Sequence, residues 1–154
     1  MNRKTVVLAT VSVAAAAVFG ATIAVPAAQS WFDGRHDQYD SYASGTAAKD
    51  ARASVPRWLP DDAGRVEYGM KTTGGDRILT AKLASAQLPK GCTPGQPAKA
   101  LGKPALNASW FPSSAHEKAA ARCEQYYAYL DGDTLHAWQY NDDWIASNKA
   151  TPGT

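Results

Sequence analysis

The stretch CEQYYAYLDGDTLHAWQYNDDW, residues 123 to 144, restricts the possible folds of this chain more than any other part of it. Asp131-Gly132 separates two runs, 123 to 130 and 134 to 140, that are rich in tyrosine, leucine and alanine. An Asp-Gly pair between two such runs is the strongest short signal for a β-hairpin. The sequence therefore predicts an antiparallel sheet that contains this hairpin.

Alternation of side chains gives the hairpin two apolar faces, with residue 130 expected opposite residue 133 across a two-residue turn. One face carries Tyr126 together with alanine and leucine side chains. The other face carries Cys123 and five candidate ligand-binding residues: Tyr127, Tyr129, His136, Trp138 and Tyr140. A hairpin with one face in water normally alternates apolar and polar residues. The absence of that alternation needs an explanation.

Two explanations are open for the aromatic face. In the first, the hairpin is central in the sheet and both of its faces are covered, which is the commoner fate of aromatic side chains. In the second, the face is open and its rings stack on a sugar or on a protein partner, as large exposed apolar patches do. We expect the covered arrangement, because Cys123 on this face would tie a covering loop to it.

A second hairpin is predicted in RVEYGMKTTGGDRILTAKL, residues 65 to 83, where Gly74-Gly75-Asp76 supplies the reversal. Residues 105 to 111 alternate and are expected to form a further strand. The sequence Ser-Ala-His-Glu at 114 to 117 matches a capping box and predicts a short helix of two turns. These elements predict one α+β domain over residues 55 to 144, with a small antiparallel sheet of four or five strands.

Cys92 and Cys123 are the two cysteines of the chain, and we expect them to form a disulfide. The bridge would close a loop of roughly 30 residues, which the chain-entropy model values at about 3–4 kcal/mol. A metal pair is disfavoured because two sulfurs alone do not complete a tetrahedral site. No metal ligand and no cofactor is therefore assigned.

Arg3 and Lys4 precede a charge-free run from residue 5 to residue 25. A positive start followed by an apolar run and small residues is typical of an export signal, but this run is also long enough to span a bilayer as a helix. Residues 1 to 27 are therefore predicted to be a signal peptide or an N-terminal membrane anchor. Membrane contact is expected only through residues 6 to 25, if they are not cleaved. Either form leaves the rest of the chain outside the cytoplasm, secreted or anchored, because the positive end stays inside.

Residues 28 to 54 are dominated by alanine, serine, glycine and acidic residues, and they show no apolar periodicity. Such a segment buries too little surface to offset its ordering entropy, so it is predicted to be a flexible linker. Asp33, His36, Asp37 and Asp40 within it are interpreted as solvated residues rather than metal ligands. Residues 145 to 154 are predicted to be a disordered tail.

Few residues indicate catalysis. The sequence contains no nucleophile elbow, no HExxH motif and no glycine-rich phosphate loop. Asp142 and Asp143 are neighbours at the end of a strand, so they point apart instead of forming an acid–base pair. His136 is the histidine to test, although a buried imidazole bonded to a tyrosine hydroxyl is the expected role. No catalytic residue is assigned, and an enzyme is the less expected class.

Four short stretches resemble small exported or membrane-anchored proteins of unassigned function from high-GC actinobacterial genomes. They are PRWLPDDA at 56 to 63, TTGGDRIL at 72 to 79, LPKGC at 88 to 92 and LDGDTLHAW at 130 to 138. The resemblance extends over most of the chain after residue 55. It implies no activity, cofactor or catalytic residue.

Charge narrows the partners that the chain can be expected to bind. Without Arg3 and Lys4, the 16 basic residues of the chain become 14, which equals its 14 acidic residues. A neutral domain lacks the basic surface that phosphate backbones require, so nucleic acid is not expected as a partner. The expected function is an extracytoplasmic binding or interaction module of the cell envelope, with an envelope protein or a glycan as ligand. The alternatives are a secreted enzyme inhibitor that presents the loop 93 to 104, and a small hydrolase.

Overall fold

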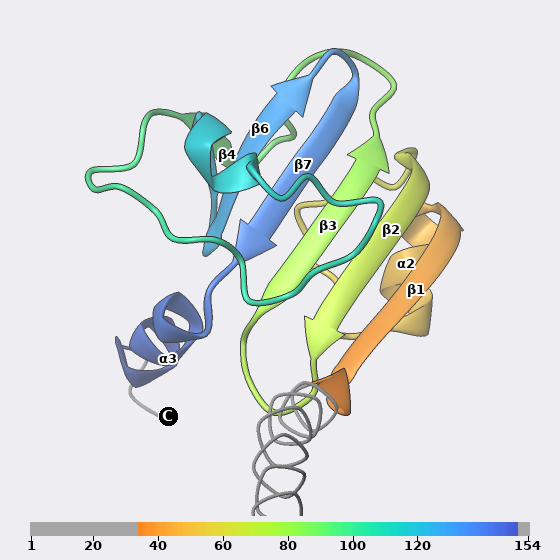
Figure 1. Ribbon diagram of the computed structural model, residues 1–154. Helices are drawn as coiled ribbons and strands as arrows, with labels where there is room; N and C mark the ends of the chain where they lie inside the picture. The colour runs from red at the N-terminus through yellow and green to blue at the C-terminus, as the bar shows by residue number, and fades with distance from the viewer. Residues whose placement is uncertain (1–33, 151–154) are drawn as a thin grey trace, which may run out of the picture. The chain divides into compact units, whose positions relative to one another are not determined.

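One antiparallel sheet organises the chain from Asp37 onward in the computed structural model, which describes residues 34 to 150 (Figure 1). Its strands are β1 (Asp37–Ser44), β2 (Gly64–Lys71), β3 (Arg77–Lys82), β4 (Cys92–Pro94), β5 (Ala121–Cys123), β6 (Tyr126–Asp131) and β7 (Thr134–Gln139). They lie in the order β1-β2-β3-β7-β6-β5-β4. The other elements are α2 (Gly45–Ala51), the 3₁₀ turn η1 (Ala115–Lys118) and α3 (Asn141–Ala150). The α+β class is confirmed, but this part of the chain has seven strands where four or five were predicted.

Both predicted hairpins are present, as β2–β3 and β6–β7. The register of β6–β7 differs from the prediction, because Leu130 pairs with Leu135 and Asp131 pairs with Thr134. The turn therefore begins at Gly132, whose φ of +61° is the left-handed conformation that the first position of a type II′ turn requires. The pairing is displaced by two residues, so each side chain of β6 and β7 keeps its predicted face.

Residues buried on the two faces of the sheet form two separate cores. The first core contains α2 and the segment after it, including Trp58 and Leu59, against the aliphatic face of the hairpin. The second core lies on the aromatic face, where the long connection between β4 and β5 crosses the sheet (Figure 1). Its buried members are Ile78, Leu106, Phe111, Ala115, Ala119, Tyr129 and Trp138. The aromatic face is therefore covered, and β7 is buried along almost its whole length.

The predicted flexible linker is wrong over residues 37 to 51, which form β1 and α2. β1 pairs along its length with β2, so the main-chain groups that face β2 are bonded although most of the β1 side chains are polar. Arg52 also bonds to Asp40 of this strand, through its Nε at 2.7 Å. Ser44 caps α2 by accepting from the amide of Ala47 at 3.1 Å. The domain thus begins near residue 37 instead of residue 55.

Three further predictions need correction. Residues 105 to 111 form no strand; they cross the aromatic face as an irregular segment that buries Leu106 and Phe111. The predicted two-turn helix is the single turn η1, and the Ser114 side chain makes no capping bond to it. The predicted tail is helical from its start through Ala150, where α3 ends.

The disulfide Cys92–Cys123 is confirmed, and it joins directly opposed residues of β4 and β5. Cys123 lies in the first core and not on the aromatic face as predicted. The cause is a reversal at Glu124, whose φ is +52°, so that Cys123 pairs with Tyr126 and shares its face.

The predicted signal peptide or anchor, residues 1 to 27, lies outside the described residues, as do residues 28 to 33. Between residues 34 and 150, no helix has the length and apolar character needed to cross a membrane.

Candidate functional site

Trp138 lies at the centre of the aromatic face and has no exposed surface. Its ring stacks on that of Tyr127, with centroids 6.1 Å apart and planes 27° apart. Its indole Nε1–H donates to the hydroxyl of Tyr140 at 3.0 Å, and that hydroxyl donates to the main-chain oxygen of Gly102. A ring that is fully enclosed in this way has no surface to offer a ligand.

His136 is also buried, with 8 % of its surface exposed. Its Nδ1 lies 3.2 Å from the hydroxyl of Thr80, across the β3–β7 pairing, and its ring stacks on that of Tyr129 at 4.9 Å. A bond to a tyrosine hydroxyl was predicted, but Thr80 is the observed partner. Burial lowers the pKa of His136, an effect that Asp131 opposes and Lys118 reinforces. Its position in the core therefore favours the neutral form of the imidazole.

Tyr127 and Tyr140 are half-buried and line a cleft of about 350 Å³ beside the loop 99 to 103. Lys99, Lys103, Asp142 and Asp143 also line it. The Arg122 guanidinium carbon lies 3.9 Å from the Tyr127 ring centroid, and Trp138 stacks on the same ring. Arg122 and Trp138 already use the ring of Tyr127, so stacking of a sugar on it is disfavoured.

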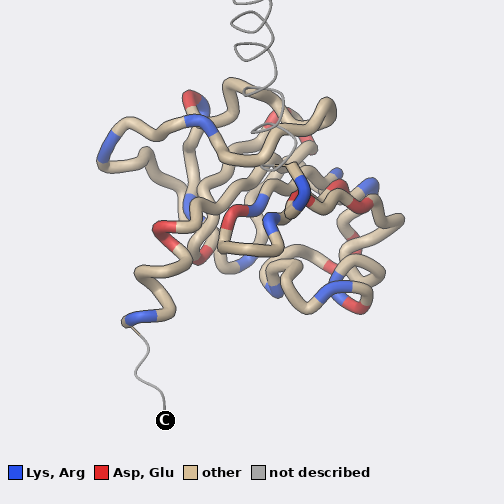
Figure 2. Tube along the Cα trace, turned by 60° about the horizontal axis from the view of Figure 1, so that its bottom comes forward, with Lys and Arg blue, Asp and Glu red and all other residues tan. Residues whose placement is uncertain are grey.

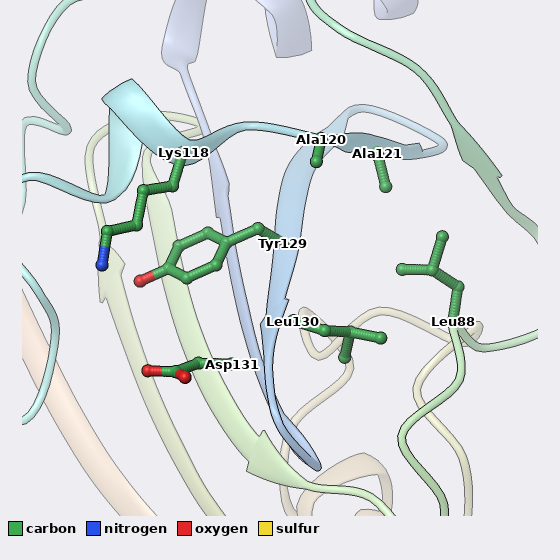
Figure 3. A pocket seen from close by; sticks show the side chains of 7 residues that line it. All are labelled: Leu88, Lys118, Ala120, Ala121, Tyr129, Leu130 and Asp131. Carbon is green, nitrogen blue, oxygen red and sulfur yellow. The ribbon is translucent and has the colours of Figure 1, made fainter.

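A second pocket, of about 420 Å³, lies at the outer edge of β6 (Figure 3). It is lined by Leu88, Lys118, Ala120, Ala121, Tyr129, Leu130 and Asp131. The figure shows Leu88 and Leu130 together on one side of the strand, with Lys118 and Tyr129 on the other. The pocket thus has an apolar part and a polar part, separated by the main chain of β6. Its volume is in the range of pockets that bind small ligands, roughly 300–1,000 Å³.

The main chain of β6 is left open where this pocket lies. β5 pairs with β6 only as far as Ala121 opposite Ala128, and the Ala120 amide donates to the Ala128 oxygen at 2.9 Å. Main-chain groups of alternate residues in an antiparallel strand point to the same side. Leu130 therefore directs its N–H and C=O away from β7, to the side where β5 has already ended.

Charged and polar groups surround this open edge. Neither Lys118 nor Asp131 forms an ion pair with another described residue, and both side chains are exposed. The Lys118 ammonium lies 5.5 Å from the ring centroid of Tyr129. The Tyr129 hydroxyl is buried and has no hydrogen-bond partner among the described residues, and burial raises its pKa, with a smaller contribution from Asp131. A buried hydroxyl without a partner is rare and needs an explanation.

Sequence reasoning identified Tyr129 as a candidate ligand-binding residue but missed Leu88, Lys118, Leu130 and Asp131. Leu130 ended a predicted strand and Asp131 began the predicted turn, yet their role depends on where the neighbouring strand stops. Lys118 was assigned to an ordinary helix. No local signal in the sequence connects Lys118, Leu130 and Asp131 with Leu88, which lies 30 to 43 residues before them.

Other kinds of site find little support in the part of the chain that the structure describes. That part holds no group of three or more His, Cys, Asp or Glu side chains that could bind a metal ion. Basic and acidic residues are interspersed along its trace (Figure 2). Several of them pair with each other, as Lys71 does with Asp37 at 3.1 Å and Lys82 with Asp133 at 3.2 Å.

Comparisons of the chain with protein-family models, with curated proteins and with solved structures found no match.

Proposed function

We propose that this domain is an extracytoplasmic binding module that takes its ligand at the outer edge of β6. The observation that supports this most is the main chain of Leu130, which no described strand pairs on the side away from β7, inside a pocket of about 420 Å³. The pocket combines an apolar wall with a cation and a carboxylate, which is the lining expected of a site that both binds and orients a ligand. The extracytoplasmic location rests on the export-like N-terminal sequence and is compatible with the disulfide.

The hydrolase alternative draws no support from the surroundings of His136. The imidazole contacts the Thr80 hydroxyl and the rings of Tyr129 and Phe111. No carboxylate of a described residue bonds to it to orient it as a general base, as acid–base catalysis by histidine usually requires. Binding is therefore the better proposal for this face of the sheet.

The inhibitor alternative is favoured by one observation, which concerns the loop 93 to 104. The loop is fixed at both ends. At its start are the Cys92 disulfide and the Gly95 amide, which donates to the Ala120 oxygen at 2.9 Å. Near its end, the Tyr140 hydroxyl donates to the main-chain oxygen of Gly102. Lys99 is exposed between these fixed points. A fixed loop with an exposed lysine suits the specificity pocket of a trypsin-like protease. Trypsin inhibition by the full chain, lost in Lys99→Ala, would establish this function instead.

The proposal is tested with a variant that fills the pocket. Ala120 lines the pocket with an exposed side chain, so Ala120→Arg should block it without disturbing the core. Ala43→Arg, at an exposed position on the opposite edge of the sheet, is the matched control. The immobilised full chain is exposed to cell-envelope extract, and retained molecules are quantified by mass spectrometry. A ligand retained by the wild type and the control but lost with Ala120→Arg supports the proposal. Equal retention by all three proteins, or none by any, contradicts it.

A further inference from the structure

We propose that the β6-edge pocket binds the free carboxyl end of a polypeptide, in extended form, with an apolar last side chain. This inference rests on the proposed function, because it assigns a ligand class to the same pocket. Addition of a peptide strand to an open sheet edge is a common mode of recognition, in which main-chain bonds supply affinity and side-chain pockets supply specificity.

The first argument is the position left vacant beside Leu130. β5 runs antiparallel to β6, and its chain leaves the sheet at Ala120. A peptide placed in the same line and direction as β5 would meet Leu130 as its next partner. Its residue opposite Leu130 would exchange two main-chain hydrogen bonds with it, as residues in a hydrogen-bonded antiparallel pair do.

The second argument concerns which end of the peptide lies at Ala120. An antiparallel peptide runs toward Ala120 with its carboxyl end, and the chain of β5 blocks any further extension. Only the C-terminal residue of a peptide therefore fits opposite Leu130. Its carboxylate would accept from the Leu130 N–H, in a pocket that the cationic side chain of Lys118 also lines. A parallel peptide would instead bring its ammonium end toward that lysine, which like charges disfavour.

The third argument concerns the side chains of the bound peptide. Paired residues of neighbouring strands share a face, so the last side chain would lie on the face of Leu130. Leu88 lies on that face as well (Figure 3), which selects an apolar last residue. The preceding side chain would lie on the opposite face, with Tyr129 and Asp131. A hydrogen-bond donor at that position would find an acceptor in the exposed Asp131 carboxylate.

The pocket thus offers an extended chain three kinds of contact: the main chain of Leu130, the apolar face with Leu88, and the opposite face with Asp131. A compact small molecule would fill one side of β6 and leave the other side empty. An extended peptide reaches both sides, because its successive side chains alternate between faces.

The test uses two arrays of tetrapeptides that are attached through their N-termini and vary in their last two residues. One array has free carboxyl ends and the other carries amidated ends, and both are probed with the labelled full chain. We expect binding to the free-acid array with leucine, isoleucine, valine, methionine or phenylalanine last, and a loss of at least tenfold on amidation. No binding to either array, equal binding to both, or a preference for a charged last residue would overturn the inference.

Two lysine variants test the contact with the carboxylate. By fluorescence anisotropy, Lys118→Gln should weaken binding of the best free-acid peptide about tenfold and leave its amidated form unaffected, while Lys118→Arg restores binding. Lys149→Gln, at an exposed lysine of α3, is the matched control and should change nothing. Equal effects of Lys118→Gln on both peptide forms would overturn the assigned direction of the chain. If the arrays show no binding but Ala120→Arg still abolishes ligand capture from extract, this inference fails while the proposed function stands.

Discussion

Replacing Trp138 with alanine should remove about 4 kcal/mol from the free energy of unfolding. The Trp138 side chain is fully buried, and burial of a tryptophan removes roughly 150–250 Å² from water. At about 25 cal/mol per Å², that area corresponds to roughly 4–6 kcal/mol, of which the methyl group of alanine retains a small part. Loss of the indole hydrogen bond adds only about 1 kcal/mol or less, because the Tyr140 hydroxyl keeps its bond to Gly102.

The measurement is urea-induced unfolding followed by circular dichroism, in which a lower midpoint with an unchanged slope reports lost stability. Trp144→Ala is the matched control, since Trp144 is 38 % exposed and its loss should cost clearly less than the loss of Trp138. A small domain holds only about 5–15 kcal/mol in total, so Trp138→Ala should be close to unfolding without denaturant. A loss below about 1 kcal/mol, or an equal loss in both variants, would refute the assignment of this ring to the core and restore the open stacking surface.

Three further predictions concern stability. Burial lowers the pKa of His136, so the unfolded chain binds a proton near its usual pKa of about 6.5 while the folded chain resists it. Stability should therefore be complete above about pH 6.5 and decline as the pH falls below it; urea midpoints at pH 7.5 and 5.5 should differ less for His136→Gln than for the wild type. Replacing both Cys92 and Cys123 with alanine should lower the free energy of unfolding by about 2–5 kcal/mol, and calorimetry showing an unchanged melting temperature would speak against a structural bridge. In Gly45→Ala, the added methyl group would meet the Pro60 carbonyl oxygen, with 1.8 Å between the ideal Cβ and that atom, so thermal unfolding should reveal a loss of about 1–3 kcal/mol. Gly64→Ala, with no atom within 4 Å of its Cβ, should lose less than Gly45→Ala.

The sequence predicted the parts of the fold that depend on local pattern. Asp131-Gly132 identified the β6–β7 hairpin, and the alternation of side chains assigned Tyr129 and Trp138 to one face although the register was displaced by two residues. β1 was missed because its side chains are mostly polar and part-exposed, and an edge strand needs only the main chain of its neighbour to form. No apolar periodicity could have indicated it.

The candidate site was less predictable, because it depends on where the pairing between β5 and β6 ends. The main chain of Leu130 is open only because the chain before β5 turns away at Ala120. That turn follows from the burial of Ala115 and Ala119 against the aromatic face, which is a contact with strands distant in sequence. The pattern of residues along the chain does not indicate where the pairing of two strands ends, or which main-chain groups lie beyond that end.

The disulfide has a consequence for the rate of folding. The central pairing of the sheet joins β3 to β7, so the two hairpins must meet across an intervening segment of about 50 residues. With Cys92 bonded to Cys123, the shortest covalent path between the two strands falls to about 20 residues. Because closure entropy grows as about 3/2 of the logarithm of loop length, the encounter of the hairpins becomes about fourfold more probable. A chain that crosses a membrane unfolded would therefore assemble this sheet faster if it is oxidised before it folds.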